Sequence, residues 1–173
     1  MVDAARFMKI IHFMNGQELE DFHLNSMQNN FAKALKAKTT QDKYDTYLLI
    51  SPYNYYFYES FADEQNKSAE STSKLNVNEL EFYIESGDWI TKMMTLPQQT
   101  DEIMFVGSVE ENRAEGAYVE FYYRTSTEGD WMIAATDTAI TLPNKIEYIQ
   151  VMARCYYVGT IRPRLNDFAL LVK

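Results

Sequence analysis

Residues 116–131, with the sequence GAYVEFYYRTSTEGDW, alternate strictly between two kinds of side chain in their first half. One set of alternate positions is apolar or aromatic, and the other carries tyrosines and charges. The two sets are Ala117, Val119, Phe121 and Tyr123, and Tyr118, Glu120, Tyr122 and Arg124. A side-chain period of two predicts a half-buried β-strand. The small polar run 125–130, with Gly129 available for a positive φ, predicts a turn into a second strand that begins at Trp131.

Similar short runs recur about every ten residues through the rest of the chain, with no helical pattern between them. They are residues 53–61, 80–85, 89–96, 102–109, 138–142, 146–155 and 165–172. Pro97 and Pro143 are expected to end two of them, and the polar run 62–74 is expected to be an exposed loop. This pattern predicts a mainly β fold: an antiparallel β-sandwich or jelly roll of about eight strands over residues 46–173.

The N-terminal part, residues 1–45, has a different pattern. Residues 15–37 predict an amphipathic helix, because Asn15 and Glu18 form a capping box and lysines gather near its end. Its apolar stripe consists of Leu19, Phe22, Met27, Phe31 and Leu35. A lone helix of this length is marginal in water, so the stripe needs a partner. Two partners remain open: the chain's own sheet, or another subunit in an attachment or oligomerisation contact.

Charge and hydropathy exclude several classes of protein. The net charge of −9 gives no basic footprint for nucleic acid or an anionic membrane. No apolar run approaches the ~18 residues of a membrane span, and no signal peptide opens the chain, so we expect a protein made in the cytoplasm without membrane insertion. The single cysteine, Cys155, continues the apolar face of the strand pattern 146–155, so we expect a buried and unreactive thiol.

No catalytic or cofactor-binding pattern is present in the sequence. The two histidines, His12 and His23, both lie in the N-terminal part, without the further His or Cys ligands of a zinc site. No nucleophile elbow or phosphate-binding glycine loop occurs. We therefore expect a protein that is not an enzyme and that has no metal, catalytic residues or cofactor.

One set of polar and aromatic residues has the character of a binding surface. The polar faces of the strand patterns 117–124 and 146–155 would form it if these strands are neighbours in one sheet. Its members are Tyr118, Tyr122, Arg124, Tyr148, Gln150 and Arg154. Tyrosine and arginine are common at protein interfaces, and such surfaces also hold sugars. Three interpretations remain open: a solvated face, a protein contact or a glycan site.

Four stretches of the chain resemble a β-sandwich module of bacteriophage tail and baseplate proteins. Residues 87–92 (GDWITK) resemble its "G-x-W-x-S" strand entry, and residues 122–131 (YYRTSTEGDW) resemble its "R-T-S-x-D-G-x-x-W" hairpin. Residues 146–154 (IEYIQVMAR) resemble "K-Y-I-Q-V-R-V", and residues 162–171 (RPRLNDFALL) resemble its closing "x-x-P-x-L-x-D-x-x-L-x-Y". The likeness covers about residues 55–173. Two departures are a tighter spacing around Gly129 and Val172 where an aromatic residue is usual.

The resemblance implies a virion structural protein of a phage tail, baseplate or fibre, assembled in the host cytoplasm, with a jelly-roll module and no enzymatic role. It implies assembly as a homotrimer or ring together with other tail proteins, attached through the N-terminal helix. Because such modules are similar to carbohydrate-binding domains, the alternative is a host-receptor module that binds a cell-surface glycan. A cellular sugar-binding accessory domain is disfavoured by the missing signal peptide.

Overall fold

The computed structural model describes Asp45, residues 52–77 and residues 82–173 of the chain. In this part the protein is mainly β, which confirms the expected fold class at that level. Nine strands occur in the described residues: β1 (Tyr55–Glu59), β2 (Asn76–Val77), β3 (Phe82–Tyr83), β4 (Gly87–Ile90), β5 (Met94–Glu110), β6 (Tyr118–Arg124), β7 (Met132–Ala134), β8 (Ala139–Tyr156) and β9 (Arg164–Val172). A 3₁₀ turn, η2 (Arg113–Glu115), precedes β6. The predicted helix and its stripe residues lie outside the described residues.

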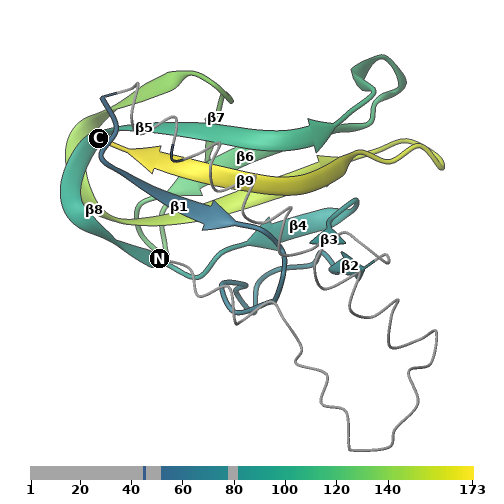
Figure 1. The fold of residues 1–173 in the computed structure, drawn as a ribbon, viewed down its shortest axis with the longest axis horizontal. Coiled ribbons are helices and arrows are strands. Elements are labelled where there is room, and N and C mark those ends of the chain that lie inside the picture. Colours follow the sequence, from purple (N-terminus) through teal and green to yellow (C-terminus); the bar gives the residue numbers. More distant parts are fainter. Residues whose placement is uncertain (1–44, 46–51, 78–81) are drawn as a thin grey trace, which may run out of the picture.

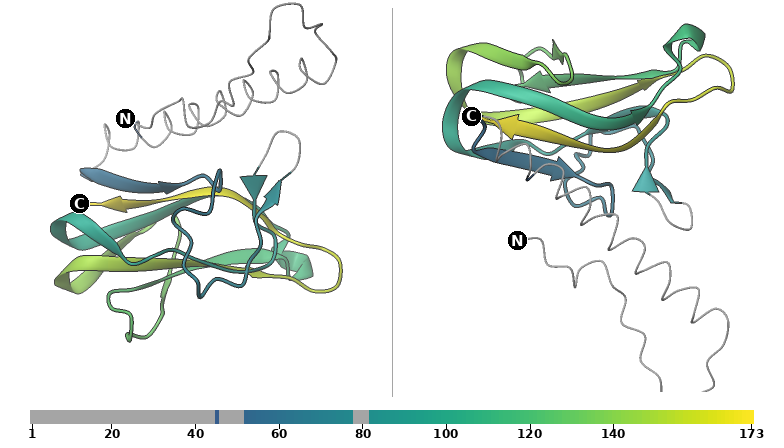
Figure 2. Two further views of the ribbon diagram at one scale, coloured as in Figure 1. Left: turned by 90° about the horizontal axis from the view of Figure 1, so that it is seen from below. Right: turned by 45° about the horizontal axis from the view of Figure 1, so that its top comes forward.

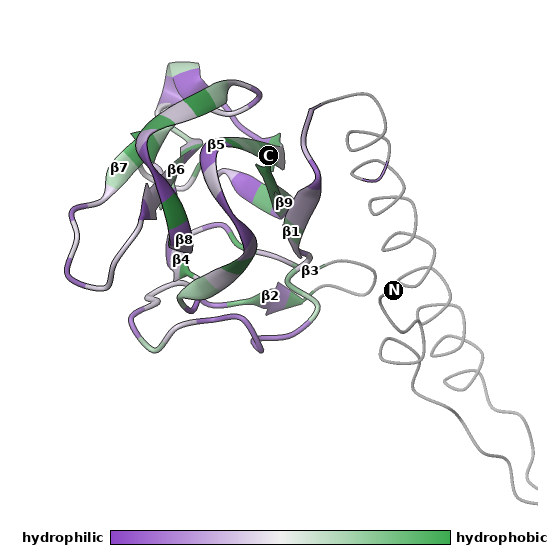
Figure 3. Ribbon diagram, turned by 90° about the vertical axis from the view of Figure 1, so that its left-hand side faces the viewer, coloured by the Kyte–Doolittle hydropathy of each residue, from purple (hydrophilic) through white to green (hydrophobic). Residues whose placement is uncertain are grey.

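Seven strands form one continuous antiparallel sheet that the long strand β8 divides into two layers. The first half of β8 pairs with β5, and the order there is β1–β9–β5–β8. The second half, from Gln150, pairs with β6 on one side and β4 on the other, giving the order β4–β8–β6–β7. We call these the first layer and the second layer. Figure 1 shows β1, β9 and β5 side by side, and Figure 3 shows them facing β6, β7 and β8.

The main core lies between the two layers and is rich in aromatic rings. Phe105 of β5 stacks on Phe121 of β6 with ring centroids 5.8 Å apart, and Phe121 also contacts Phe168 of β9 at 5.4 Å. The predicted apolar face of β6 supplies four buried residues: Ala117, Val119, Phe121 and Tyr123. The predicted apolar face of β8 supplies four more: Ile149, Val151, Ala153 and Cys155. The period-two reading of both strands is therefore confirmed.

Two proline positions were interpreted wrongly from the sequence. Pro97 lies inside β5, and Pro143 lies inside β8, so neither ends a strand. Proline lacks the N–H that a ladder needs, but it is tolerated where pairing is irregular. Between Thr95 and Thr100 the pairing of β5 with β8 shifts register, so Pro97 needs no ladder partner there. The predicted runs 89–96 and 102–109 are consequently a short β4 and one long β5. The turn at Gly129 also differs from the prediction, because Gly129 does not adopt a positive φ.

The segment 62–74 is only partly the exposed loop that its polar composition predicts. Its backbone lies along the free edge of β4, where Ser68 donates to the Ile90 carbonyl at 2.7 Å and Ser73 donates to the Asp88 carbonyl at 3.1 Å. Ser73 is buried. Composition misjudged this segment because the contacts come from its backbone, which every residue type carries. The segment thus covers a strand edge that would otherwise be open to pairing.

Gly87, at the start of β4, tests how tightly this segment packs. Its φ is +74°, and a Cβ there would lie 3.0 Å from the Ser73 nitrogen. We expect Gly87→Ala to lower the free energy of unfolding by about 2 kcal/mol or more, combining the positive φ with a backbone clash. Gly159 is a matched control, since its φ is +66° but nothing lies within 4 Å of its added Cβ. Gly159→Ala should cost about 1 kcal/mol in the same urea titration. Equal losses for the two variants would contradict close packing of 62–74 on β4.

Candidate functional site

Five of the six predicted face residues come together on the outer surface of the second layer. Tyr118, Tyr122 and Arg124 lie on β6, and Gln150 and Arg154 lie beside them on β8, with Arg124 opposite Gln150 in the strand register. Tyr148 does not join them. It pairs with Thr95 of β5, beyond the end of β6, and it is 46% exposed. The expected neighbourhood of the two strands is thus found, but one of its members belongs to the first layer.

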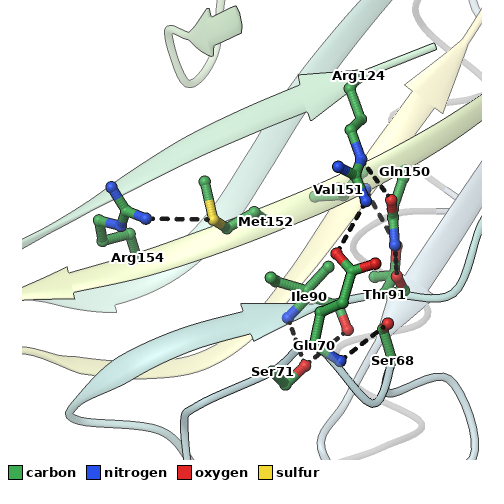
Figure 4. Close-up of polar contacts among 10 residues, drawn as sticks. All are labelled: Ser68, Glu70, Ser71, Ile90, Thr91, Arg124, Gln150, Val151, Met152 and Arg154. Atoms are coloured by element: carbon green, nitrogen blue, oxygen red, sulfur yellow. Dashed lines mark hydrogen bonds and ion pairs between the residues drawn. The ribbon is translucent and has the colours of Figure 1, made fainter. Parts of the chain in front are cut away.

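Arg124 is the centre of a buried hydrogen-bond network at one end of this face (Figure 4). Its Nε donates to Gln150 Oε1 at 2.6 Å, and its Nη2 donates to Glu70 Oε2 at 2.8 Å. Gln150 in turn donates from Nε2 to the Thr91 carbonyl at 2.7 Å. Only 8% of Arg124 and 3% of Gln150 remain exposed. The guanidinium also lies over the ring of Trp131, 4.5 Å from its centroid. These contacts connect β6, β8, β4 and the segment 62–74.

Arg154 forms the second node of the face. Its Nε and Nη2 donate to the two carboxylate oxygens of Asp88 at 2.7 and 2.8 Å, a bidentate pair between β8 and β4. The pair with Asp88 raises the pKa of Arg154 further above its usual range. The guanidinium carbon lies 5.6 Å from the centroid of the Tyr122 ring. The charge of Arg154 is therefore paired with Asp88, and its guanidinium plane is in contact with the Tyr122 ring.

The tyrosines of the face are also engaged with one another. Tyr118 stacks on Tyr156 at a centroid distance of 4.8 Å, and the Arg113 guanidinium carbon lies over the Tyr118 ring, 5.0 Å from its centroid. The Tyr122 hydroxyl donates to Glu120 and lies 2.9 Å from the Tyr156 hydroxyl. Burial, and then the hydrogen bond to Glu120, raise the pKa of Tyr122. Tyr122 is therefore a neutral hydrogen-bonding group at ordinary pH.

What the face can do chemically follows from these contacts. Its two arginines are paired within the chain, Arg124 with Glu70 and Gln150, and Arg154 with Asp88. Burial raises the pKa of the Cys155 thiol to about 12, which leaves no thiolate for chemistry. Within the described residues, no cluster of three or more His, Cys, Asp or Glu side chains could hold a metal ion. The arrangement holds β4, β6 and β8 together through side chains.

Glu59, at the end of β1, is a buried carboxyl that sequence reasoning missed. Only 3% of it is exposed, and desolvation raises its pKa to about 7. One oxygen accepts a hydrogen bond from the Phe61 amide at 3.0 Å. The other has no hydrogen-bond partner of good geometry among the described residues, and neither has the nearby Trp89 Nε1. A pKa near 7 is typical of catalytic acids, but a substrate cannot reach a carboxyl this deeply buried.

Other members of the network were also absent from the sequence prediction. They are Glu70, Asp88, Thr91 and Tyr156. Tyr156 could have been found, because it continues the alternation of β8 by one step beyond Arg154. Asp88 and Glu70 carry no such signal. They lie in stretches that were interpreted as turn and loop, and their partners are distant in sequence.

Replacing Arg124 tests whether this network is structural. We expect Arg124→Met to lower the free energy of unfolding by about 2–3 kcal/mol, because it leaves the buried Gln150 oxygen without its donor. Arg113→Met is the matched control, since the Arg113 side chain is 62% exposed and pairs only at the surface. It should change stability by less than about 1 kcal/mol. Guanidinium denaturation followed by circular dichroism measures both. If Arg124→Met had the same free energy of unfolding as the native chain, the network would not contribute to stability.

The comparisons with known proteins add no relative to this description. No family model, no curated protein and no solved structure matches the chain. No helix of the described part has the length and apolarity to span a membrane.

Proposed function

We propose that the chain is a virion structural protein of a bacteriophage tail, baseplate or fibre. Its two layers are assigned to an antiparallel β-sandwich of jelly-roll type, which makes contacts with neighbouring subunits or with the host surface. Residues 1–45 attach it, and residues 46–173 form the sandwich. Its partners are further copies of itself, in a homotrimer or ring, and other tail proteins.

The observation that carries this proposal is where the phage-like motifs lie in the fold. Three of the four stretches form adjacent strands: GDWITK on β4, IEYIQVMAR on β8 and YYRTSTEGDW at the end of β6. One pair of characteristic residues is in direct contact: Arg124 of the "R-T-S" hairpin donates to Gln150 of the "Y-I-Q-V" strand. Residues that recur in a motif because they hold a module together are expected to meet in this way. The motifs therefore act as one set of fold determinants, which supports the resemblance.

The state of the polar face favours assembly over chemistry or ligand capture. A glycan site needs free hydrogen-bonding groups and an uncovered ring face. On this face Arg124 and Arg154 are already paired, and the rings of Tyr118 and Tyr122 have neighbours within the chain. A preformed surface of this kind loses little conformational entropy when it meets another protein. This is the property that a repeated subunit contact requires.

A genetic experiment tests the proposed function. A nonsense codon early in the gene, in the phage that encodes the chain, should give particles with incomplete tails, or complete particles that do not attach to the host. Electron microscopy and adsorption assays measure the two defects. Growth on a suppressor host should restore both. Normal particles with normal adsorption on a non-suppressing host would contradict the proposal.

A glycan-binding role remains the second candidate because of one exposed ring. Tyr148 is 46% exposed on β8 and belongs to no stacked pair in the described residues. If the chain is a host-receptor module, Tyr148→Ala should abolish binding to host cells or to a glycan array while leaving stability unchanged. Tyr148 is a better probe than Tyr122 or Arg154, whose replacement would also disturb the strand contacts. A glycan array without any binding would exclude this role.

A further inference from the structure

The first layer has a second apolar face, on the side away from the main core. Two rows of side chains form it across β1, β9 and β5, in the order Tyr56–Leu171–Met104 and Tyr58–Ala169–Val106. Ala169 and Leu171 are 0% exposed, and Val106 is 2% exposed. Tyr53, just before β1, is also buried against this cluster. The face is therefore as apolar and as dry as a core, although it is the outer side of the layer.

The burial of this face requires a cover from the same chain. The three residues are buried in a single chain, so no second copy is needed to exclude water from them. Among the described residues, the strands of the second layer lie on the opposite side of the first layer, as the left view of Figure 2 shows. The two partly buried tyrosines and Met104 are part of the face itself and form its rim. A further segment must complete the layer, since a sheet face is hydrophobic only where another element packs on it.

We propose that residues 15–37 pack on this face as a helix of the same chain. Their apolar stripe would provide the covering surface for this face; it consists of Leu19, Phe22, Met27, Phe31 and Leu35. A helix of this length extends for about 35 Å. The nine residues of β9 extend for about 30 Å, so the helix and the strand match in length.

The position of the chain entry supports this occupant. The described chain enters the first layer at its edge strand β1, and the Tyr56 hydroxyl on the face donates to Asp45 at 2.8 Å. Asp45 therefore lies at the rim of the face. Residues 38–44 separate it from the end of the predicted helix, and such a stretch reaches at most about 25 Å when extended. The helix end is thus confined to the neighbourhood of the face.

This inference decides between the two partners that the sequence left open for the stripe. The stripe then belongs to the domain's own layer. The inference rests on the buried face of the first layer and not on the proposed function. A glycan-binding protein of the same fold would need the same cover.

Photo-crosslinking in the full chain tests the inference. p-Benzoylphenylalanine replaces Met104, and the unlabelled variant is mixed with the ¹⁵N-labelled variant before illumination. Mass spectrometry should find cross-links from position 104 to residues 15–37, and both halves of each cross-linked pair should carry the same isotope label. Phe31→Asp should reduce their yield to background. Asn25→Asp, on the opposite side of a 3.6-residue helix, should leave the yield unchanged.

The same probe at Ile133, which is 64% exposed on β7, should give only background cross-links to residues 15–37. A probe at Tyr58 repeats the test if the Met104 variant has an altered thermal melt. Pairs of mixed isotope label would show that a second copy covers the face and would overturn the inference. Cross-links from both positions that avoid residues 15–37, or none above background, would overturn it as well.

Discussion

Replacement of Trp89 by alanine is expected to lower the free energy of unfolding by about 3–5 kcal/mol, the range for deleting a large buried aromatic ring. Trp89 is 0% exposed and lies between the two layers. It meets Phe61 edge to face at a centroid distance of 4.9 Å, and the Lys67 ammonium lies 5.2 Å from its ring centroid. Its loss would leave a cavity where β4, β1 and the segment 62–74 converge.

The other tryptophan provides the control for this experiment. Trp131 is only half-buried, and the guanidinium of the buried Arg124 lies over its ring. Trp131→Ala should cost about 2 kcal/mol, the size of a desolvated cation–π contact. Urea denaturation by circular dichroism measures both variants. Equal losses of stability for Trp131→Ala and Trp89→Ala would contradict this expectation, because Trp89 would then not be the main anchor of β4.

The second large effect is expected at Glu59 and depends on pH. Its carboxyl has a pKa of about 7 in the folded chain, raised by burial, and an ordinary value of 4.5 in the unfolded chain. Below pH 4.5 both states are protonated and the group imposes no penalty. As pH rises from 4.5 to 7 the unfolded state loses its proton first, so stability falls, and above pH 7 the loss is complete at about 3 kcal/mol.

Glu59→Gln should remove this loss, because the amide is neutral and keeps an oxygen that can accept from the Phe61 amide. We expect the variant to match the native chain near pH 4 and to exceed it by up to about 3 kcal/mol at pH 8. Denaturation midpoints at a series of pH values measure the difference. Glu128→Gln, at an exposed turn position, should follow the native profile. A constant difference between Glu59→Gln and the native chain at every pH would refute the assignment.

The strands and their buried faces were predictable because they depend on local alternation. A period of two in the sequence identifies which side of a strand meets the main core, and β6 and the second half of β8 place their apolar side there. Arg124, Gln150 and Met152 on the other side are buried as well. Strand ends were less predictable. Pro97 and Pro143 read as terminators, yet both lie within long strands whose pairing is irregular or open at those points. Whether a proline ends a strand depends on the neighbouring strand, which the local sequence does not specify.

The candidate face was predictable in its members but not in their state. Alternation placed Tyr118, Tyr122, Arg124, Gln150 and Arg154 on one surface, and the structure brings them together. Their partners Glu70 and Asp88 come from other parts of the chain, so the pairing that closes the face to ligands could not be read locally. Glu59 carried even less signal. Desolvation raises its pKa, and the chain that follows β1 turns at Phe61, a non-glycine residue with a φ of +55°; such a turn has no sequence signature.

We propose that the chain is a structural part of a phage particle, and quantitative mass spectrometry of purified particles, from the phage that encodes it, tests this most directly. We expect the chain to be present in intact particles after a high-salt wash, in a copy number that matches a trimer or ring of the tail. Particles that infect normally and lack the chain would contradict it.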